Sequence, residues 1–226
     1  MTRLFVTSTG TEIGKTHVTA ALAHLARIAG RSLRVVKPLV SGFDPAAPEG
    51  SDPAVLAAAA GLALDAALDR ISPWRYRAPL SPDMAASREG KAIDFAALTE
   101  FCRDALAGPE DCVLVEGVGG VMVPLDGQHT VRDWIAALGI PAVLVAGSYL
   151  GTLSHTLTAR LALEDAGIPL QAVVVSESET APVPLAETVA ALRHFIPDTP
   201  IIGLPRRPGA ESWRDAPELL AIVKSI

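Results

Sequence analysis

The stretch from 8 to 16, Ser-Thr-Gly-Thr-Glu-Ile-Gly-Lys-Thr, constrains this chain more than any other. It follows a short apolar run at 4–6 and precedes an Ala- and Leu-rich segment at 18–28, so the sequence predicts a strand, a tight loop and a helix. Small residues in such a loop let backbone N–H groups surround an anion, and the following helix directs its positive end towards it. The sequence therefore predicts a phosphate-binding loop.

Two side chains at the end of this loop carry the chemistry of a nucleotide site. Lys15 can reach the β- and γ-phosphates, and the Thr16 hydroxyl can coordinate Mg²⁺. The usual motif begins with a glycine five residues before Gly14, where this chain has Thr9. A glycine-rich turn without a ligand is the alternative, and the strand, loop and helix context argues against it.

Composition and charge exclude several classes of protein. Of the 226 residues, 50% are hydrophobic and 19% are charged, which allows a sizeable core. The net charge is −6 without a basic block, so nucleic acid is not an expected partner. Neither a signal peptide nor a membrane span is predicted, because no apolar run approaches about 18 residues. The two cysteines, Cys102 and Cys112, do not form a metal-type pair and fit the reducing cytoplasm.

Polar residues follow two further predicted strands, at 33–36 and 112–115. Lys37 comes after the first, and Glu116 with a glycine-rich turn comes after the second. Ligand-binding residues of parallel sheets lie at the carboxyl ends of strands, so both side chains are expected near the phosphate-binding loop. An acid in this place is where P-loop enzymes keep the carboxylate near the metal. Taken alone, Lys37 reads equally well as a solvated lysine.

Other segments admit two interpretations each. Asp52 precedes a helix predicted to reach about residue 68, and it either caps that helix or helps to hold the metal. The stretch 72–82 is predicted to be a loop that either lines a ligand or crosses the surface. Another helix is predicted to start at 151–155, which makes a plausible anion site. His155 within it is more often a packing residue than a catalyst.

The predicted fold class is α/β. Predicted strands and helices alternate along the chain, and neither a repeat nor a linker divides it. This pattern predicts a single P-loop domain over 1–226, with a mostly parallel sheet and helices on both faces. Its site is expected at the carboxyl edge of the sheet.

Together, the motifs resemble those of the dethiobiotin synthetase family, nearly from end to end. They are Thr-Glu-Ile-Gly-Lys-Thr at 11–16, Lys-Pro-Leu-Val-Ser-Gly at 37–42, Ser-Asp at 51–52, Pro-Leu-Ser-Pro at 79–82, Val-Glu-Gly-Val-Gly-Gly at 115–120 and Leu-Gly-Thr-Leu-Ser-His at 150–155. The resemblance implies a homodimer that uses ATP, Mg²⁺ and CO₂. The implied substrate is 7,8-diaminononanoate, whose ureido ring is closed to give dethiobiotin, ADP and phosphate.

In the implied reaction, one amine takes up CO₂ as a carbamate, whose oxygen attacks the γ-phosphate, and the second amine then displaces phosphate. Catalytic roles are implied for Lys37, Lys15, Thr11 and Ser41. Metal ligation by oxygen is implied for Thr16, Asp52 and Glu116. Nucleotide contacts are implied for Glu12, Ile13, Gly14, Lys15, Thr16, His17, Asp52, Glu116, Gly117, Val118, Gly119, Ser176, Pro205, Arg206 and Arg207. Substrate contacts are implied for Thr11, Ser41 and a helix start that each subunit offers to the other, Gly151, Thr152, Leu153 and Ser154.

The chain departs from the family's usual pattern at three positions. Ser8 stands where the loop usually begins with glycine, and Ser154 where an asparagine precedes the histidine. Ser176 stands where an asparagine reads the adenine edge. The shorter hydroxyl of Ser176 predicts weaker discrimination between nucleotide bases.

Competing interpretations use related folds. A partitioning-type ATPase switch would carry a lysine five residues before Lys15, where this chain has Gly10. A cobyric-acid-type amidotransferase would need a glutaminase domain, for which the chain is too short. A non-catalytic nucleotide-binding module would leave Lys37, Ser41 and Glu116 without a clear purpose.

Overall fold

The computed structural model describes residues 1–224; residues 225–226, the end of the predicted domain and of its predicted helical tail, lie outside the described part. The strands are β1 (Thr2–Ser8), β2 (Leu33–Val36), β3 (Leu39–Ser41), β4 (Trp74–Tyr76), β5 (Cys112–Glu116), β6 (Ala142–Ala146), β7 (Leu170–Ser176) and β8 (Ile201–Leu204). The α-helices are α1 (Lys15–Ile28), α2 (Asp52–Ala60), α3 (Leu64–Ile71), α4 (Pro82–Arg88), α5 (Phe95–Leu106), α6 (Val131–Leu138), α7 (Thr152–Asp165), α8 (Leu185–Phe195) and α9 (Leu220–Lys224). Three short 3₁₀ helices are η1 (Pro48–Gly50), η2 (Ser212–Arg214) and η3 (Pro217–Leu219).

A six-stranded sheet in the order β2-β5-β1-β6-β7-β8 forms the centre of the molecule. Each of its neighbouring strands pairs in parallel. The carboxyl ends of the strands therefore meet at one edge. β1 lies between β5 and β6, so the loop that follows β1 emerges in the middle of this edge.

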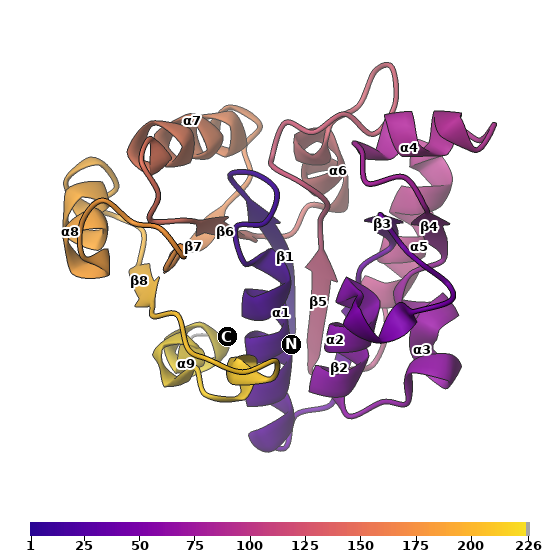
Figure 1. Ribbon diagram of the computed structural model, residues 1–226, viewed down its shortest axis with the longest axis horizontal. Helices are drawn as coiled ribbons and strands as arrows, with labels where there is room; N and C mark the ends of the chain where they lie inside the picture. Colours follow the sequence, from indigo (N-terminus) through magenta and orange to yellow (C-terminus); the bar gives the residue numbers. More distant parts are fainter. Residues whose placement is uncertain (225–226) are drawn as a thin grey trace.

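Helices cover both faces of the sheet, as the alternating pattern predicts. Side chains alternate along β1, so Val6 belongs to the core that includes residues of α1, α2 and α9, and its neighbour Phe5 belongs to the core that includes residues of α5, α6 and α8. Figure 1 shows α7 and α8 at one end of the molecule and α3, α4 and α5 at the other. The predicted α/β fold is confirmed.

Two segments differ from the sequence prediction. The helix expected from 52 to about 68 is divided into α2 and α3, because Gly61 adopts a φ of 72° and ends α2. The stretch 72–82, expected to be a loop, contains β4, which pairs in parallel with β3 in a second, two-stranded sheet. A strand of three residues is too short to be recognised by its alternation of side chains.

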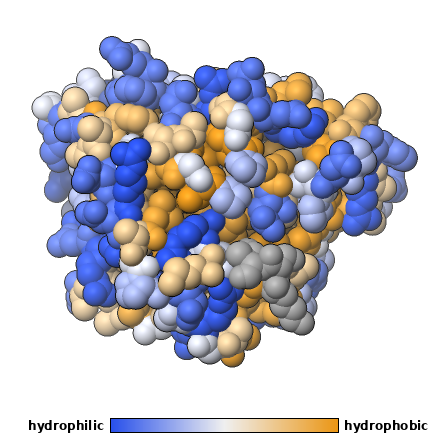
Figure 2. Space-filling view, turned by 180° about the vertical axis from the view of Figure 1, so that it is seen from behind, coloured by the Kyte–Doolittle hydropathy of each residue, from blue (hydrophilic) through white to orange (hydrophobic). Residues whose placement is uncertain are grey.

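Apolar side chains are not confined to the interior. Figure 2 shows hydrophobic residues gathered in the middle of one face, with hydrophilic residues around them. Exposed large apolar side chains include Met122, Leu150, Leu153 and Leu161. Within residues 1–224, no helix has the length and apolar character needed to cross a membrane.

Candidate active site

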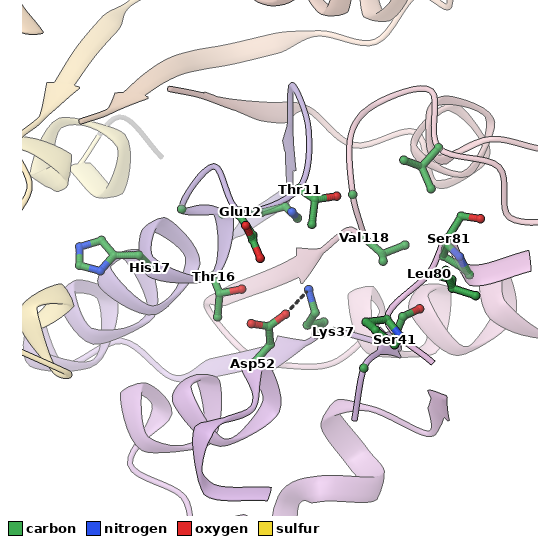
Figure 3. Close-up of a pocket in the computed structure, with 17 residues that line it drawn as sticks. Thr11, Glu12, Thr16, His17, Lys37, Ser41, Asp52, Leu80, Ser81 and Val118 are labelled. Carbon is green, nitrogen blue, oxygen red and sulfur yellow. Dashed lines mark ion pairs between the residues drawn. The ribbon is translucent and has the colours of Figure 1, made fainter. Parts of the chain in front are cut away.

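A cavity of about 780 Å³ opens at the carboxyl edge of the sheet, beside the loop between β1 and α1. We call residues 8–16 the phosphate loop. Figure 3 shows side chains of the phosphate loop on one side of this cavity and Ser41, Leu80 and Ser81 on the other. The predicted site residues that line it are Thr11, Glu12, Gly14, Lys15, Thr16, His17, Lys37, Ser41, Asp52, Val118 and Gly119.

The backbone of the phosphate loop turns sharply at two residues. Glu12 has a φ of 58°, the one positive value outside glycine among the described residues, and Gly14 has a φ of 90°. A Cβ at Gly14 would lie 2.6 Å from the Oγ of Ser176, so a side chain has no room there. This turn places the N-terminus of α1 at the cavity, where its N–H groups and dipole favour an anion.

Ser8 holds the base of the phosphate loop where the family usually has glycine. Its buried hydroxyl lies 2.6 Å from the carbonyl oxygen of Gly10 and 2.9 Å from that of Gly119. Lys15 Nζ donates to the hydroxyl oxygen of Ser8 at 3.3 Å. The serine is therefore accommodated, and it connects the loop, its lysine and the turn after β5.

Four side chains from separate motifs form one network below the loop. Lys37 Nζ lies 2.6 Å from Oε1 of Glu116 and 3.0 Å from Oδ2 of Asp52. Thr16 donates its hydroxyl to the same Glu116 oxygen at 2.7 Å. Figure 3 shows Lys37 and Asp52 pointing towards each other. The structure thus brings together residues that the sequence separates by 100 positions, and Asp52 is an ion-pair partner rather than a helix cap.

Burial and neighbouring charges shift the pKa values in this network. Burial, and then the positive charge of Lys37, lower the pKa of Lys15 to about 8. Burial alone would lower the pKa of Lys37, but the charges of Glu116 and Asp52 outweigh it and raise that pKa. Burial opposes ionisation of Asp52, yet Lys37 lowers its pKa below the usual value. The site thus keeps fixed charges of both signs close together.

The residues predicted to contact the nucleotide base lie outside the cavity lining. Arg207 pairs with Glu218 at 2.6 Å, and the backbone N–H of Arg206 donates to Glu177 at 2.9 Å. Burial, and then the charges of Arg207 and Arg206, lower the pKa of His17. Ser176 packs against Gly14, and Pro205 precedes the two arginines. These side chains therefore gather near the first turn of α1, beyond the phosphate loop.

The remaining predicted nucleotide residues support the loop rather than line the cavity. Ile13 packs on the core beneath α1, and Glu116 is fully buried. A Cβ at Gly117 would lie 2.8 Å from the ring of Phe5, which explains the glycine after β5.

The start of α7 does not line this cavity. Thr152 is buried, its hydroxyl donates to the carbonyl of Gly147 at 2.7 Å, and its N–H donates to the carbonyl of Tyr149 at 3.1 Å. Gly151, Leu153 and Ser154 are exposed instead. The first N–H groups of a helix lack partners within it. Of the predicted substrate residues on α7, Leu153 and Ser154 therefore offer backbone N–H groups at an exposed helix start.

A second cavity, of about 450 Å³, is lined by the phosphate loop, the segment 120–124 after β5 and α7. Thr11 and Val123 line both cavities, and His155 on α7 lines the second. His155 Nδ1 lies 2.8 Å from the hydroxyl of Tyr149, so the histidine has a partner in the segment just before α7. The two cavities therefore adjoin at Thr11 and Val123.

The sequence did not single out Gly42 or Val123 as lining residues, and it left the role of the segment 79–82 open. Gly42, Val123 and the segment 79–82 line the large cavity. The Pro-Leu-Ser-Pro motif at 79–82 was the available signal, but its composition fits a surface crossover equally well. Val123 carries no signal in the sequence, because only the turn after Gly120 brings it to the cavity.

Comparison with known proteins places this geometry in a family. A family model described as an AAA domain matches residues 2–211. The chain is 48% identical over 218 residues to the ATP-dependent dethiobiotin synthetase BioD of Acidiphilium cryptum, covering 95% of this chain and 98% of the relative. It is 49% identical to the protein of the same name from Caulobacter sp. (strain K31), covering 94% of this chain and 90% of that protein.

A similarity among solved structures concerns the fold alone. The cell-division ATPase MinD of Pyrococcus furiosus superposes with a TM-score of 0.56, at 18% identity, over 99% of this chain and 96% of that one. At that identity, the shared architecture carries no argument for a partitioning ATPase. The motif geometry and the close relatives agree instead that the chain belongs to the dethiobiotin synthetase family.

Proposed function

We propose that the large cavity carboxylates 7,8-diaminononanoate with CO₂ and closes the ureido ring of dethiobiotin at the expense of ATP, releasing ADP and phosphate. One observation carries this proposal. Lys15 and Lys37 line the same cavity as the hydroxyl-bearing Thr11 and Ser41, although Thr11 and Lys15 come from the phosphate loop and Lys37 and Ser41 from the segment 37–42. A carbamate and a triphosphate repel each other, so a site that joins them needs this fixed positive charge.

The side chains of the cavity fit the steps of the reaction. One amine adds to CO₂, and an oxygen of the carbamate attacks the γ-phosphate while the ammonium groups of Lys15 and Lys37 neutralise the developing charge. The second amine attacks the carbonyl carbon of the mixed anhydride, and phosphate leaves. Ser41 Oγ is buried without a hydrogen-bond partner in the described part of the chain, so it is available to orient the carbamate, together with Thr11.

Mg²⁺ is proposed to bind at Thr16, Asp52 and Glu116. The residues fit it, because all three offer hard oxygen atoms and Oε2 of Glu116 is buried without a partner among residues 1–224. When bound, Mg²⁺ supplies positive charge beside the phosphate oxygens.

ATP is proposed to lie along the phosphate loop and the turn after β5. Glu12, Ile13, Gly14, Lys15, Thr16, His17, Gly117, Val118 and Gly119 would surround the phosphates and sugar, and Ser176, Pro205, Arg206 and Arg207 the base. We propose that one domain over 1–226 provides this whole set. Thr16 and Glu116 already share a hydrogen bond, which supports a common ligand.

A homodimer is proposed to complete the diamine site. The start of α7 is exposed and flanked by Leu150, which is 86% exposed, and Leu153. Met122 lines the second cavity beside it and is 50% exposed. Covering these apolar side chains with a second copy would bring Leu153 and Ser154 of one subunit to the cavity of the other, where their N–H groups would receive the substrate carboxylate.

We propose the cytoplasm as the compartment, with neither nucleic acid nor membrane as a partner. Cys102 and Cys112 are both free and buried, which fits a reducing environment.

The test of function is an assay of ureido formation from the diamine. Product that requires ATP and CO₂ together supports the proposal, and ATP hydrolysis without any dethiobiotin overturns it.

A further inference from the structure

The ammonium group of Lys37 has three hydrogen-bonding partners and three hydrogens to give them. Nζ lies 2.6 Å from Oε1 of Glu116, 3.0 Å from Oδ2 of Asp52 and 3.1 Å from the carbonyl oxygen of Gly117. Its side chain is only 3% exposed. All its donors are therefore committed to oxygens at the floor of the cavity, and none is left for a phosphate or a carbamate.

Two of these acceptors are the carboxylates proposed to hold Mg²⁺. Oε1 of Glu116 already accepts from both Lys37 and Thr16. A fully buried carboxylate such as Glu116 needs a positive partner, because an unpaired charge in the interior is costly. Lys37 fills that requirement for Glu116, as a bound cation would.

We infer that Lys37 is a placeholder for the metal. Its ammonium group occupies the carboxylates of Asp52 and Glu116 until a divalent cation arrives with the nucleotide, and it then moves to the phosphate and the carbamate. The inference rests on the metal ligands given under the proposed function. It assigns to Lys37 a second role, which is to keep the metal site closed while no nucleotide is bound.

The charges of the cluster explain why metal and nucleotide would arrive together. Lys15, Lys37, Asp52 and Glu116 carry two positive and two negative charges, so the cluster is formally neutral. A divalent cation alone would leave a large positive charge in a buried site. A nucleotide that accompanies the cation supplies the compensating negative charge, and it offers Lys37 new acceptors in exchange for those it gives up.

Removal of Lys37 should therefore create a metal site that does not need nucleotide. Mn²⁺ serves as the probe, and electron paramagnetic resonance measures the free ion in titrations of the nucleotide-free protein. Lys37→Met should bind Mn²⁺ at least about tenfold more tightly than the wild type, since charges about 3 Å apart interact by several RT even at an effective dielectric constant of about 20. Adding Glu116→Gln to Lys37→Met should abolish the gain.

Lys15→Met is the matched control. It removes the same charge from the same cluster but leaves Lys37 on its carboxylates. A gain confined to Lys37→Met supports the placeholder role. An equal gain in Lys15→Met, or no gain in Lys37→Met, overturns it.

Loss of a buried ion-pair partner can also unfold the protein, so the same variants are melted with and without Mn²⁺. A marginally stable Lys37→Met or Lys37→Gln protein should show a Tm that Mn²⁺ raises, because a ligand that binds the folded state stabilises it. A Tm that does not respond to Mn²⁺ counts against the inference. Titration of wild type with Mn²⁺ and ADP together tests the proposed metal ligands separately: failure there removes the metal site itself, whatever Lys37 does.

Discussion

The phosphate cavity and the start of α7 differ in how far one chain completes them. In the cavity, Lys37, Asp52, Glu116 and Thr16 already contact one another through short ion pairs and a hydrogen bond. At α7, Leu150 and Leu153 face solvent and Ser154 has no charged partner among the described contacts. The charged groups of the cavity are paired within one chain, whereas the start of α7 presents apolar surface and an exposed helix end.

The difference follows from the position of the two regions in the sheet. The cavity lies where three neighbouring strands, β5, β1 and β2, end side by side, so several segments supply side chains at once. α7 follows β6, which lies on the other side of β1 in the sheet, and Gly151, Leu153 and Ser154 at the start of this helix are exposed. A buried polar network can therefore form at the phosphate cavity, whereas the start of α7 leaves a surface for another molecule.

The largest expected effect tests the cavity. Lys37→Ala should lower kcat by about 10²–10³-fold, the usual consequence of removing one group that stabilises transition-state charge. Nucleotide should still bind, which a fluorescent ATP analogue measures. Lys91→Ala, at an exposed lysine outside the cavity, is the control. If Lys37→Ala turns over like wild type, Lys37 has no catalytic role.

Complementation tests the start of α7. Neither Lys15→Ala nor Ser154→Glu alone should be active, the first for lack of the phosphate-loop charge and the second because a carboxylate at the exposed helix start repels the substrate carboxylate. In mixed dimers, one of the two sites would combine an intact phosphate loop with an intact helix start, and activity should return to a fraction of wild type. Ser154→Thr is the conservative control. Verified mixed dimers without activity would mean that each chain builds its whole site alone.

The buried thiol of Cys102 tests how well the core excludes water. Burial raises the pKa of Cys102 to about 12 from the usual 9. The unfolded thiol ionises first, so the unfolding free energy should fall between about pH 9 and 12, by about 1.4 kcal/mol per pH unit at most. Below pH 9 this loss should vanish. The difference between wild type and Cys102→Ala in urea melts at pH 8 and 10 isolates the effect, and an unchanged difference would show that the thiol is hydrated.

The smallest effect concerns the nucleotide base. Ser176 should discriminate ATP from CTP and GTP less well than an asparagine, because losing one neutral hydrogen bond costs about 0.5–1.5 kcal/mol, roughly 2- to 13-fold. Values of kcat/KM for the three nucleotides, in wild type and in Ser176→Asn, measure it. A wild type that prefers ATP a thousandfold, with no change in the variant, would place base recognition elsewhere, for example at Arg206 or Arg207.

Local motifs sufficed to predict several of these features. The spacing of Gly14, Lys15 and Thr16 after an apolar run predicted the loop and the helix, and α1 begins at Lys15. Short elements were beyond reach, because β4 owes its existence to pairing with β3 rather than to its own pattern. The lining by Val123 and Gly42 depends on loop paths, which local preferences do not fix.

The sequence by itself determined the alternation of strands and helices, the phosphate loop and the residues that mark the family, because each depends on neighbours in the chain. Only the tertiary structure decided that Lys37, Asp52 and Glu116 share a single ion cluster. It also decided that the Thr152 hydroxyl is buried in a hydrogen bond to Gly147 while Ser154 is exposed. Such pairings depend on the order of strands in the sheet, which brings β2 and β5 together across long stretches of chain. Distance in space, unlike propensity, is a property of the whole fold.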